Sequence, residues 1–367
     1  MSLPVRPPVS PMLAKLEPEI PLGDGWRYEP KWDGFRAIVF RDGDDVRIDS
    51  RDSRPLGRYF PEVVQLLARR LPARCVVDGE IVVAAKKGLD FDALQMRLHP
   101  AESRVRKLAA EIPASFVAFD LLALGDKDLT RESMGARRSE LERALGGGRS
   151  KVPVAGPDSL VAGATNLLLT PQTDDAQTAR RWFSELERLG LDGIVAKRED
   201  GPYVPGKRVM VKVKHRRTAD CVVGGYRRSK AGDGVGSLLL GLYQDGVLHY
   251  VGHTSSFRAE ERRALLKFLA PYEGGDAFGF GGIEADVGRM PGGASRWGGG
   301  EGEWVALDGR LVCEVSFDHL QSGRFRHAAR FLRWRDDKPP KECTYDQLAP
   351  PGEAESTARR GSERGRR

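Results

Sequence analysis

Hydrophobic and polar residues follow two different patterns along this chain, and the change falls near residue 215. Before it, short apolar runs rich in β-branched and aromatic residues alternate with segments whose apolar residues recur at helical spacing. The runs that predict strands are 35–40, 45–50, 74–84, 114–124 and 191–199, and those that predict helices are 57–71 and 174–190. The polar turn between the first two runs predicts a hairpin. The pattern therefore predicts one α+β domain over residues 1–215.

After residue 215 the chain is rich in glycine and in short strand-like runs. These runs are 219–226, 236–253 and 310–320, with one amphipathic helix predicted over 258–272. Several short strands with Asp-Gly turns and a single helix are typical of a small β-barrel such as an OB-fold. We predict this barrel over 216–348, with a mobile glycine-rich loop at 274–302, and a disordered basic tail over 349–367.

Composition favours a cytoplasmic protein with a polyanionic partner. Hydrophobic residues make up 40% of the 367 residues, and no apolar run is long enough to cross a membrane. The proline-rich N-terminus lacks the apolar core of a signal peptide. The four cysteines lie far apart without a CxxC pair, which argues against a zinc site or a disulfide framework. The net charge of +7 fits a polyanion, although the same bias can serve solubility alone.

The segment KWDGFR, residues 31–36, is a candidate for covalent chemistry. A lysine attacks only as the free amine, and roughly one in a thousand is unprotonated near neutral pH. Lys31 therefore needs cationic neighbours, a metal ion or desolvation, and Arg36, Trp32 and Phe35 lie close to it in sequence. Gly34 would let a backbone or a ligand approach closely. The simpler interpretation is an exposed lysine at a strand end, with Asp33 as its ion-pair partner.

Two further segments supply carboxylates. Asp78 and Glu80 have the spacing of residues on one face of a strand, and Asp192 precedes Lys197 on another predicted strand. Hard oxygen ligands on separate strands suit Mg²⁺, which leans on one or two carboxylates plus substrate phosphates. For each segment taken alone, an Asp-Gly turn is the more ordinary explanation.

Paired lysines and a phenylalanine complete the set of candidates. Lys212 and Lys214 alternate with apolar residues and so share one strand face, where two like charges favour a bound phosphate. A solvated strand face explains the same pattern. Phe119 could stack on a nucleobase, although a phenylalanine in a strand is usually part of the core.

The order of these segments resembles the covalent nucleotidyltransferases, and among them the ATP-dependent DNA ligases, closest to the short actinobacterial ligases often called ligase C. The matching segments are KWDGFR at 31–36, Arg51, DGE at 78–80, FVAFDLL at 116–122, LDGIVAK at 191–197, VKVK at 211–214 and an RxDK pattern at 335–338. The fourth motif has Asp192 where the family usually has glutamate, so its carboxylate reaches one methylene less. In the fifth, Met210 replaces a tryptophan. The match spans nearly the whole chain.

The resemblance implies a fold and a mechanism. The fold is an adenylation domain of antiparallel sheets flanked by helices, followed by the OB-fold barrel. Lys31 would attack the α-phosphate of ATP and form lysyl-AMP, AMP would pass to the 5′-phosphate of a nick, and the 3′-hydroxyl would displace it. Gly34 would leave room for the nucleotide.

The resemblance also assigns the other residues. Those that would balance phosphate charge are Arg36, Arg51, Lys212 and Lys214. Those near the nucleoside are Phe119, Lys197 and Glu29, which would help fix the adenine or orient Lys31. Those that would hold Mg²⁺, with Mn²⁺ as a substitute, are Glu80 and Asp192, and those that would orient pyrophosphate when the OB domain closes are Arg335, Asp337 and Lys338.

The resemblance implies nicked double-stranded DNA as substrate, a role in DNA repair and recombination with repair-protein partners, a monomer, and a bacterial, nucleoid-associated location. No large helical DNA-binding region precedes the first motif, so we expect weak, salt-sensitive nick binding. Two rivals use the same lysine chemistry: an RNA ligase and an RNA-capping guanylyltransferase. A rival of another class is a non-catalytic, nucleic-acid-binding OB protein, and an NAD-dependent ligase is disfavoured because its zinc-binding cysteines are absent.

Overall fold

The structure of the protein is a computed structural model. It describes residues 1–86, 88–146, 152–156, 162–215, 217–229, 231–278, 304–318, 320–321 and 323–348. Contacts divide the chain into two compact units, Met1–His215 and Arg216–Arg367. The tail at 349–367 and almost all of the glycine-rich loop at 274–302 lie outside the described residues.

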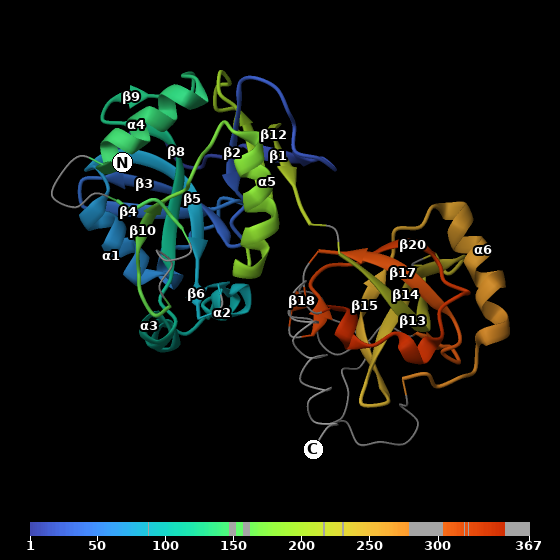
Figure 1. The fold of residues 1–367 in the computed structure, drawn as a ribbon. Helices are drawn as coiled ribbons and strands as arrows, with labels where there is room; N and C mark the ends of the chain where they lie inside the picture. Colours follow the sequence, from blue (N-terminus) through green and yellow to red (C-terminus); the bar gives the residue numbers. More distant parts are fainter. Residues whose placement is uncertain are drawn as a thin grey trace, which may run out of the picture. The chain divides into compact units, whose positions relative to one another are not determined.

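The first unit contains two sheets flanked by helices (Figure 1). The larger sheet has the order β10-β8-β5-β3-β4, with β9 paired to β8, and the smaller has the order β1-β12-β11-β2. The strands of the larger sheet are β3 Phe35–Asp42, β4 Asp45–Ser50, β5 Arg74–Val82, β8 Ser115–Leu124, β9 Lys127–Asp128 and β10 Leu167–Leu169; those of the smaller are β1 Leu13–Leu16, β2 Trp26–Pro30, β11 Ile194–Arg198 and β12 Arg208–Val213. The remaining elements are the β6 Ala84–Ala85 and β7 Gly88–Leu89 pair, the helices α1 Pro61–Arg70, α2 Phe91–Met96, α3 Glu102–Glu111, α4 Met134–Gly146 and α5 Ala176–Glu185, and the 3-10 turns η1 Gly57–Tyr59 and η2 Leu186–Leu189.

The predicted antiparallel architecture is confirmed, with one parallel pair at an edge of each sheet. Strands β3, β4, β5 and β8 pair antiparallel throughout, whereas β10 runs parallel to β8 and β1 runs parallel to β12. The hairpin predicted over 35–50 is the β3–β4 pair, which turns at Gly43 with a φ of 64°.

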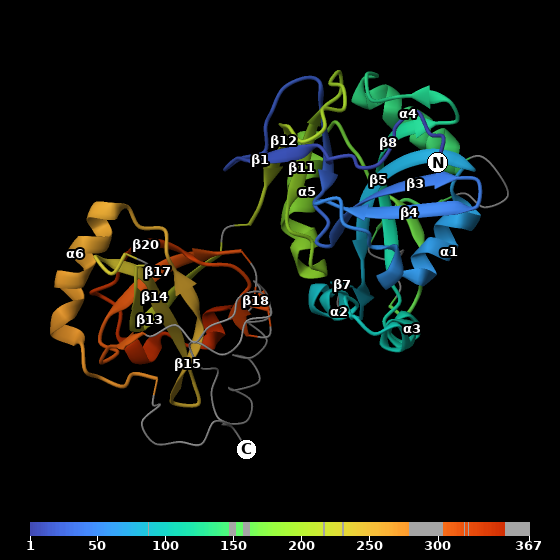
Figure 2. The same ribbon diagram turned by 180° about the vertical axis from the view of Figure 1, so that it is seen from behind.

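Alternation along β3 builds two cores on opposite faces of the larger sheet. Val39 packs in the core that includes α1 residues such as Leu67. Ile38 and Phe40 pack instead with Met210 of β12, in the core that joins the two sheets. Figure 2 shows β11, β12 and α5 beside the larger sheet from behind. A period of two thus fixes which side chains of β3 face the helices and which face the smaller sheet.

Two predicted helices are shorter than their apolar patterns. The helix predicted over 57–71 begins at Pro61, because proline suits the first helical position and η1 occupies the residues before it. The helix predicted over 174–190 is α5, with Asp175 as its N-cap, followed by η2 and by Gly190 at a φ of 77°.

The second unit is the predicted barrel. Its strands are β13 Arg217–Arg228, β14 Val235–Gln244, β15 Val247–Thr254, β16 Val305–Ala306, β17 Val312–Phe317 and β20 Arg330–Trp334, with α6 Ala259–Leu269, the β18 Leu320–Gln321 and β19 Arg324–Phe325 pair, and the 3-10 turns η3 Ala270–Tyr272, η4 Pro340–Glu342 and η5 Tyr345–Leu348. The sheet has the order β15-β14-β13-β17-β20, with β16 paired to β13. A parallel bridge between Thr254 and Ala329 brings its two ends together, as an OB-fold requires.

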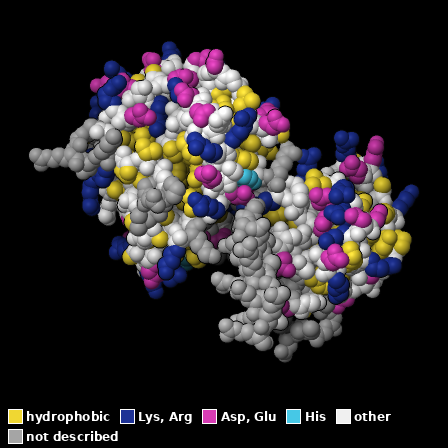
Figure 3. Space-filling model, viewed as in Figure 1, with side chains coloured by type: hydrophobic (Ala, Val, Ile, Leu, Met, Phe, Trp, Pro, Cys, Tyr) yellow, Lys and Arg dark blue, Asp and Glu magenta, His cyan; other side chains and the backbone are white. Residues whose placement is uncertain are grey.

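Surface features add little to the assignment of function. The described helices are all too short or too polar to span a bilayer. On the face seen in Figure 3, lysine and arginine side chains are interspersed with acidic ones over both units. The four cysteines are free and buried: Cys75 in the first unit, and Cys221, Cys313 and Cys343 in the second.

The expectation that Gly34 leaves room for a nucleotide is corrected by the backbone that surrounds this residue. A Cβ at this position would lie 2.2 Å from the backbone oxygen of Ile81 on β5. Glycine is therefore required because the backbone itself approaches closely, which was the other reading of this residue.

We predict that Gly34→Ala lowers the free energy of unfolding by about 3 kcal/mol, because the β3–β5 pair must shift to admit the methyl group. Urea unfolding of the purified variant measures the change. Gly146→Ala is the matched control, since a Cβ there meets nothing within 4 Å. An unchanged unfolding midpoint for Gly34→Ala would contradict the close approach.

Candidate active site

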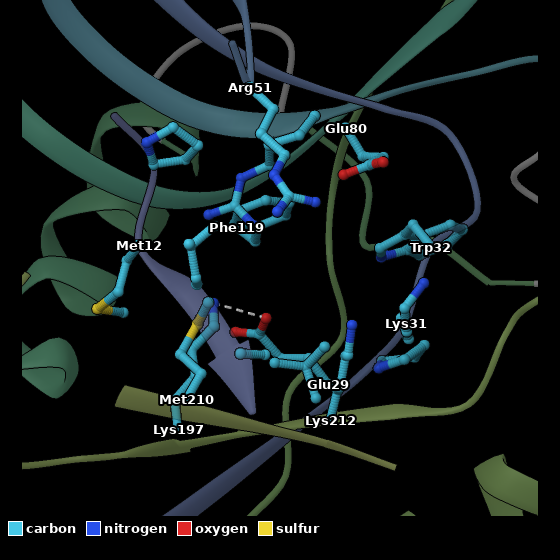
Figure 4. A pocket seen from close by; sticks show the side chains of 16 residues that line it. Met12, Glu29, Lys31, Trp32, Arg51, Glu80, Phe119, Lys197, Met210 and Lys212 are labelled. Atoms are coloured by element: carbon cyan, nitrogen blue, oxygen red, sulfur yellow. Dashed lines mark ion pairs between the residues drawn. The ribbon is translucent and has the colours of Figure 1, made fainter. Parts of the chain in front are cut away.

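A cavity of about 180 Å³ in the first unit gathers most of the residues singled out from the sequence. The predicted residues that line it are Glu29, Lys31, Arg36, Arg51, Glu80, Phe119, Lys197 and Lys212. Lys31 and Lys212 extend into this space from one side, and Arg51 and Glu80 approach it from the other (Figure 4). Cations from both sheets thus converge on one small volume, an arrangement suited to a polyphosphate.

Main-chain hydrogen bonds place Lys31 beside Asp192. Lys31 directly follows β2; its backbone N–H donates to Gly193 O at 2.9 Å, and the backbone N–H of Asp192 donates to Lys31 O at 3.0 Å. The strand predicted over 191–199 accordingly begins only at Ile194, because Gly193 turns with a φ of 126°. The two side chains then meet, with Lys31 Nζ 2.7 Å from Asp192 Oδ2.

Asp192 is shared by two lysines. Lys214 Nζ lies 2.8 Å from the same Oδ2 atom, and the Asp192 side chain is only 5% exposed. Lys214 directly follows β12, and its charge is close enough to Lys212 to lower the pKa of that lysine. Lys212 lines the cavity, whereas Lys214 pairs with Asp192, the carboxylate that also pairs with Lys31.

This pairing affects the two lysines in opposite ways. Burial is the largest single effect and works to lower the pKa of Lys31, but attraction to Asp192, together with that to Asp33 and Glu80, raises the pKa above its ordinary value. Burial, together with repulsion from Lys214 and Lys31, lowers the pKa of Lys212. Without bound nucleotide, Lys31 is therefore a paired ammonium group and not a free amine.

Arg36 is held by a buried carboxylate. Its Nε and Nη2 donate to the two oxygens of Asp78 at 2.5 and 2.6 Å, and Asp78 also accepts from the Tyr203 hydroxyl at 2.6 Å. The Asp78 side chain is fully buried. Asp78 therefore fixes Arg36, and the fork geometry expected for phosphate is already taken up by this carboxylate.

Phe119 lies under two cations. The Arg36 guanidinium lies 4.4 Å and Lys197 Nζ 4.8 Å from the ring centroid, both within cation–π range. Lys197 pairs with Glu29 at 2.7 Å, and Gln172 donates to Glu29 at 2.9 Å. Glu29 thus contacts Lys197 rather than Lys31, contrary to one expected role of orienting the nucleophile.

Glu80 and Glu29 are the two carboxylates that line the cavity. Burial raises the pKa of Glu80 to about 7, in spite of the opposing effect of Arg36 and Lys31. Asp192 pairs with Lys31, and both Asp192 and Glu80 act on the charge of that lysine. Two carboxylates beside a phosphate-sized cationic space fit the donor set that Mg²⁺ uses with nucleotides. Among the described residues no cluster of three or more His, Cys, Asp or Glu side chains could hold a metal without such a substrate.

Three predicted residues belong to the second unit. Arg335 contacts Asp220 and Asp337, each at 2.8 Å, and Lys338 Nζ lies 3.0 Å from Glu342. Each of these two cations is thus paired within its own unit.

Sequence reasoning missed the N-terminal wall of the cavity. Residues 11–14 line it, and the backbone N–H of Met12 donates to Tyr203 at 3.0 Å. Tyr203 thereby joins this segment to Asp78 and Arg36. A tyrosine in a polar loop carries no local signal of this role, because its partners lie 125 and 191 residues away in the chain.

We predict that Glu80 makes the first unit less stable as pH rises from about 4.5 to 7. The folded chain holds a proton on Glu80 up to about pH 7, whereas the ordinary pKa is 4.5, so protonation favours folding and the contribution is lost as pH rises through the folded value. The difference corresponds to about 3 kcal/mol. Urea unfolding across this range should show the decline in the wild type and not in Glu80→Gln; parallel curves for the two proteins would contradict it.

Comparisons with known proteins identify the family of this chain. Residues 11–214 match the model of the ATP dependent DNA ligase domain, and residues 231–338 match that of the ATP dependent DNA ligase C terminal region. The chain is 50% identical to DNA ligase C2 of Mycolicibacterium smegmatis, covering 97% of this chain and 98% of that one. It is 51% identical to DNA ligase C of Mycobacterium tuberculosis, covering 96% of each.

One solved structure, titled as a structure-function analysis of Lig E DNA ligases binding DNA with a minimal scaffold, shares the fold. It covers 88% of this chain and 99% of its own, with a TM-score of 0.52 at 18% identity. The extent of the family match, together with the cavity around Lys31, leads to one conclusion: this chain belongs to the ATP-dependent DNA ligase family.

Proposed function

We propose that this ligase seals nicks in double-stranded DNA through a covalent lysyl-AMP intermediate on Lys31. The observation that carries the proposal is the position of Lys31 at the wall of a cavity that also presents Arg51, Lys212 and Phe119. A nucleophile, phosphate-balancing cations and an aromatic ring are the parts that nucleotidyl transfer needs, because such reactions depend on positioning and charge stabilisation.

In the first step the free amine of Lys31 attacks the α-phosphorus of ATP. A phosphorus–nitrogen bond forms, the bond to the bridging oxygen breaks, and pyrophosphate leaves. The ammonium must first lose a proton, and Asp192, 2.7 Å away, is the carboxylate placed to receive it. AMP then passes to the 5′-phosphate of the nick, and the 3′-hydroxyl displaces it to join the strand.

The cavity residues divide between the two ends of the nucleotide. Arg51 and Lys212 balance phosphate charge. Lys214 contributes to this charge balance through Asp192, the carboxylate that it shares with Lys31. Phe119 contacts the adenine ring, where stacking contributes about 1–3 kcal/mol per base. Glu29 and Lys197, paired at 2.7 Å, support this nucleoside end, and Arg36 acts by fixing Phe119 from its own place on Asp78.

Glu80 and Asp192 are the residues that would hold Mg²⁺, with Mn²⁺ as a substitute. The ion supplies positive charge at the phosphates of bound ATP. Shared between two lysines, Asp192 already has strong electrostatic partners, so Glu80 is the carboxylate with the freer approach to the cavity.

The second unit serves the first step and the DNA. We assign the RxDK segment, with Arg335, Asp337 and Lys338, to the pyrophosphate end of ATP during lysine adenylation. Basic residues of both units then hold the nick. We further propose that the protein acts as a monomer in bacterial DNA repair, in the cytoplasm at the nucleoid, alongside repair-protein partners.

Incubation with α-labelled ATP and Mg²⁺, without DNA, tests the nucleophile. The wild type should acquire a label that is acid-labile and sensitive to hydroxylamine, because a phosphoramidate is. Lys31→Ala should stay unlabelled. Lys127→Ala, which removes an exposed lysine of β9, is the control and should label like the wild type.

An unlabelled wild-type protein would contradict the proposal, and labelling by GTP in place of ATP would indicate guanylyl transfer instead. Label in Lys31→Ala would move the nucleophile to another residue.

Nick affinity should fall steeply with salt. Each neutralised phosphate contributes a slope of about −0.9 to the logarithm of the binding constant against the logarithm of salt. Binding of Lys31→Ala to nicked duplex, between about 50 and 200 mM salt, measures the slope without turnover. Intact duplex of the same sequence serves as the reference, and a flat dependence would exclude a mainly electrostatic mode of binding.

A further inference from the structure

Arg335, which directly follows β20, has all three guanidinium nitrogens occupied. Its Nη1 donates to both oxygens of Asp220, at 2.8 and 3.0 Å. Its Nε and Nη2 donate to the two oxygens of Asp337, each at 2.8 Å. Two carboxylates on one arginine exceed what charge balance requires, so the question is what each of them does.

The two carboxylates differ in how firmly they are held. Asp337 lies two residues beyond Arg335 in an exposed turn, and its side chain is 67% exposed. The Asp220 side chain is 18% exposed and lies on β13, 115 residues earlier in the chain. Gln347 pins the backbone of Asp220 on both sides, accepting from its N–H at 2.7 Å and donating to its carbonyl at 3.1 Å. Asp220 is therefore the fixed partner and Asp337 the exposed one.

The two carboxylates also bind different edges of the Arg335 guanidinium. Asp337 occupies the Nε–Nη2 edge, a fork that matches a carboxylate or a phosphate with two parallel hydrogen bonds. Asp220 uses Nη1 alone and leaves that fork free for exchange. A phosphate oxyanion can therefore replace the exposed Asp337 while Asp220 keeps hold of the arginine.

We propose that Asp220 is a positioning residue for lysine adenylation, and that it aims the Nε–Nη2 edge of Arg335 at the pyrophosphate end of ATP. Asp337 occupies this edge when no phosphate is bound. The inference rests on the proposed function, in which Arg335 acts on pyrophosphate in the first step and not in the later ones. Asp220 itself touches no reacting atom.

The step that fails distinguishes positioning from a general structural role. Asp220→Asn removes the charge but keeps the backbone atoms that Gln347 contacts, so the local fold is preserved. Two reactions are measured in single turnover: labelling of Lys31 by ATP, and sealing of a nick whose 5′-phosphate already carries AMP. The second reaction bypasses lysine adenylation.

Asp220→Asn should slow labelling by about 10- to 100-fold, the usual cost of a misplaced group, and should leave sealing of the adenylated nick within about twofold of wild type. Asp220→Glu, which restores the carboxylate, should recover part of the labelling rate. Pyrophosphate should also reverse the lysyl-AMP of Asp220→Asn more slowly, because the same contact acts in both directions.

Glu314→Gln is the matched control. Glu314 lies directly opposite Asp220 in the β13–β17 register and pairs with Arg333 at 2.7 Å. Its loss removes a neighbouring carboxylate–arginine pair and should change neither reaction.

Equal loss in both reactions would overturn the inference in favour of a structural role, and unchanged labelling in Asp220→Asn would overturn it outright. Failure of the proposed function looks different, since the wild-type protein would then acquire no label at all.

Discussion

The active site depends on how the end of β2 pairs with the start of β11. Lys31 and Asp192 exchange main-chain contacts through Gly193, and these two hydrogen bonds extend the antiparallel ladder past the last regular residues. Gly193 is required because a Cβ there would lie 2.0 Å from the backbone oxygen of Val213 on β12. Three strands thus meet at Lys31, the proposed nucleophile, so its position in the chain is set by backbone contacts and not by its own flexible side chain.

The charges around that point suit a bound polyanion. Several cations line the cavity, and buried carboxylates hold three of them: Asp192 pairs with Lys31, Asp78 with Arg36 and Glu29 with Lys197. The protein is thereby stable without nucleotide, at the cost of keeping Lys31 protonated. Under the proposed mechanism, binding of a polyphosphate must redistribute these pairs before the amine of Lys31 can react, so the contacts that hold these charges also contribute to the barrier of the reaction.

The sequence was sufficient for the architecture and for most cavity residues, because strand periodicity and short motifs are local signals. It placed β3, β5, β8 and the barrel strands β13, β14, β15 and β17, but not β20, and most of the residues that its motifs singled out in the first unit line one cavity. It could not give the partners of those residues. Arg36 is predicted to balance phosphate charge, but it donates to both oxygens of Asp78. The β3–β5 register places Glu80 directly opposite Arg36 and makes Asp78 its diagonal neighbour. Helices α2, α3 and α4 also escaped prediction. Burial of Arg137 in α4 against Asp120 depends on a pair 17 residues apart that no periodicity reports.

The four buried cysteines can report local opening of the fold through the rates at which their thiols react. Burial raises the pKa of Cys75 and of Cys343 to about 12, so neither thiol reacts readily while the fold is closed. Reaction with a thiol reagent must then wait for local opening, and its rate reads the frequency of that opening. Cys75 belongs to the first unit and the other three to the second. The order in which the thiols react therefore tells which of the two units opens locally more often, and no engineered cysteine is needed.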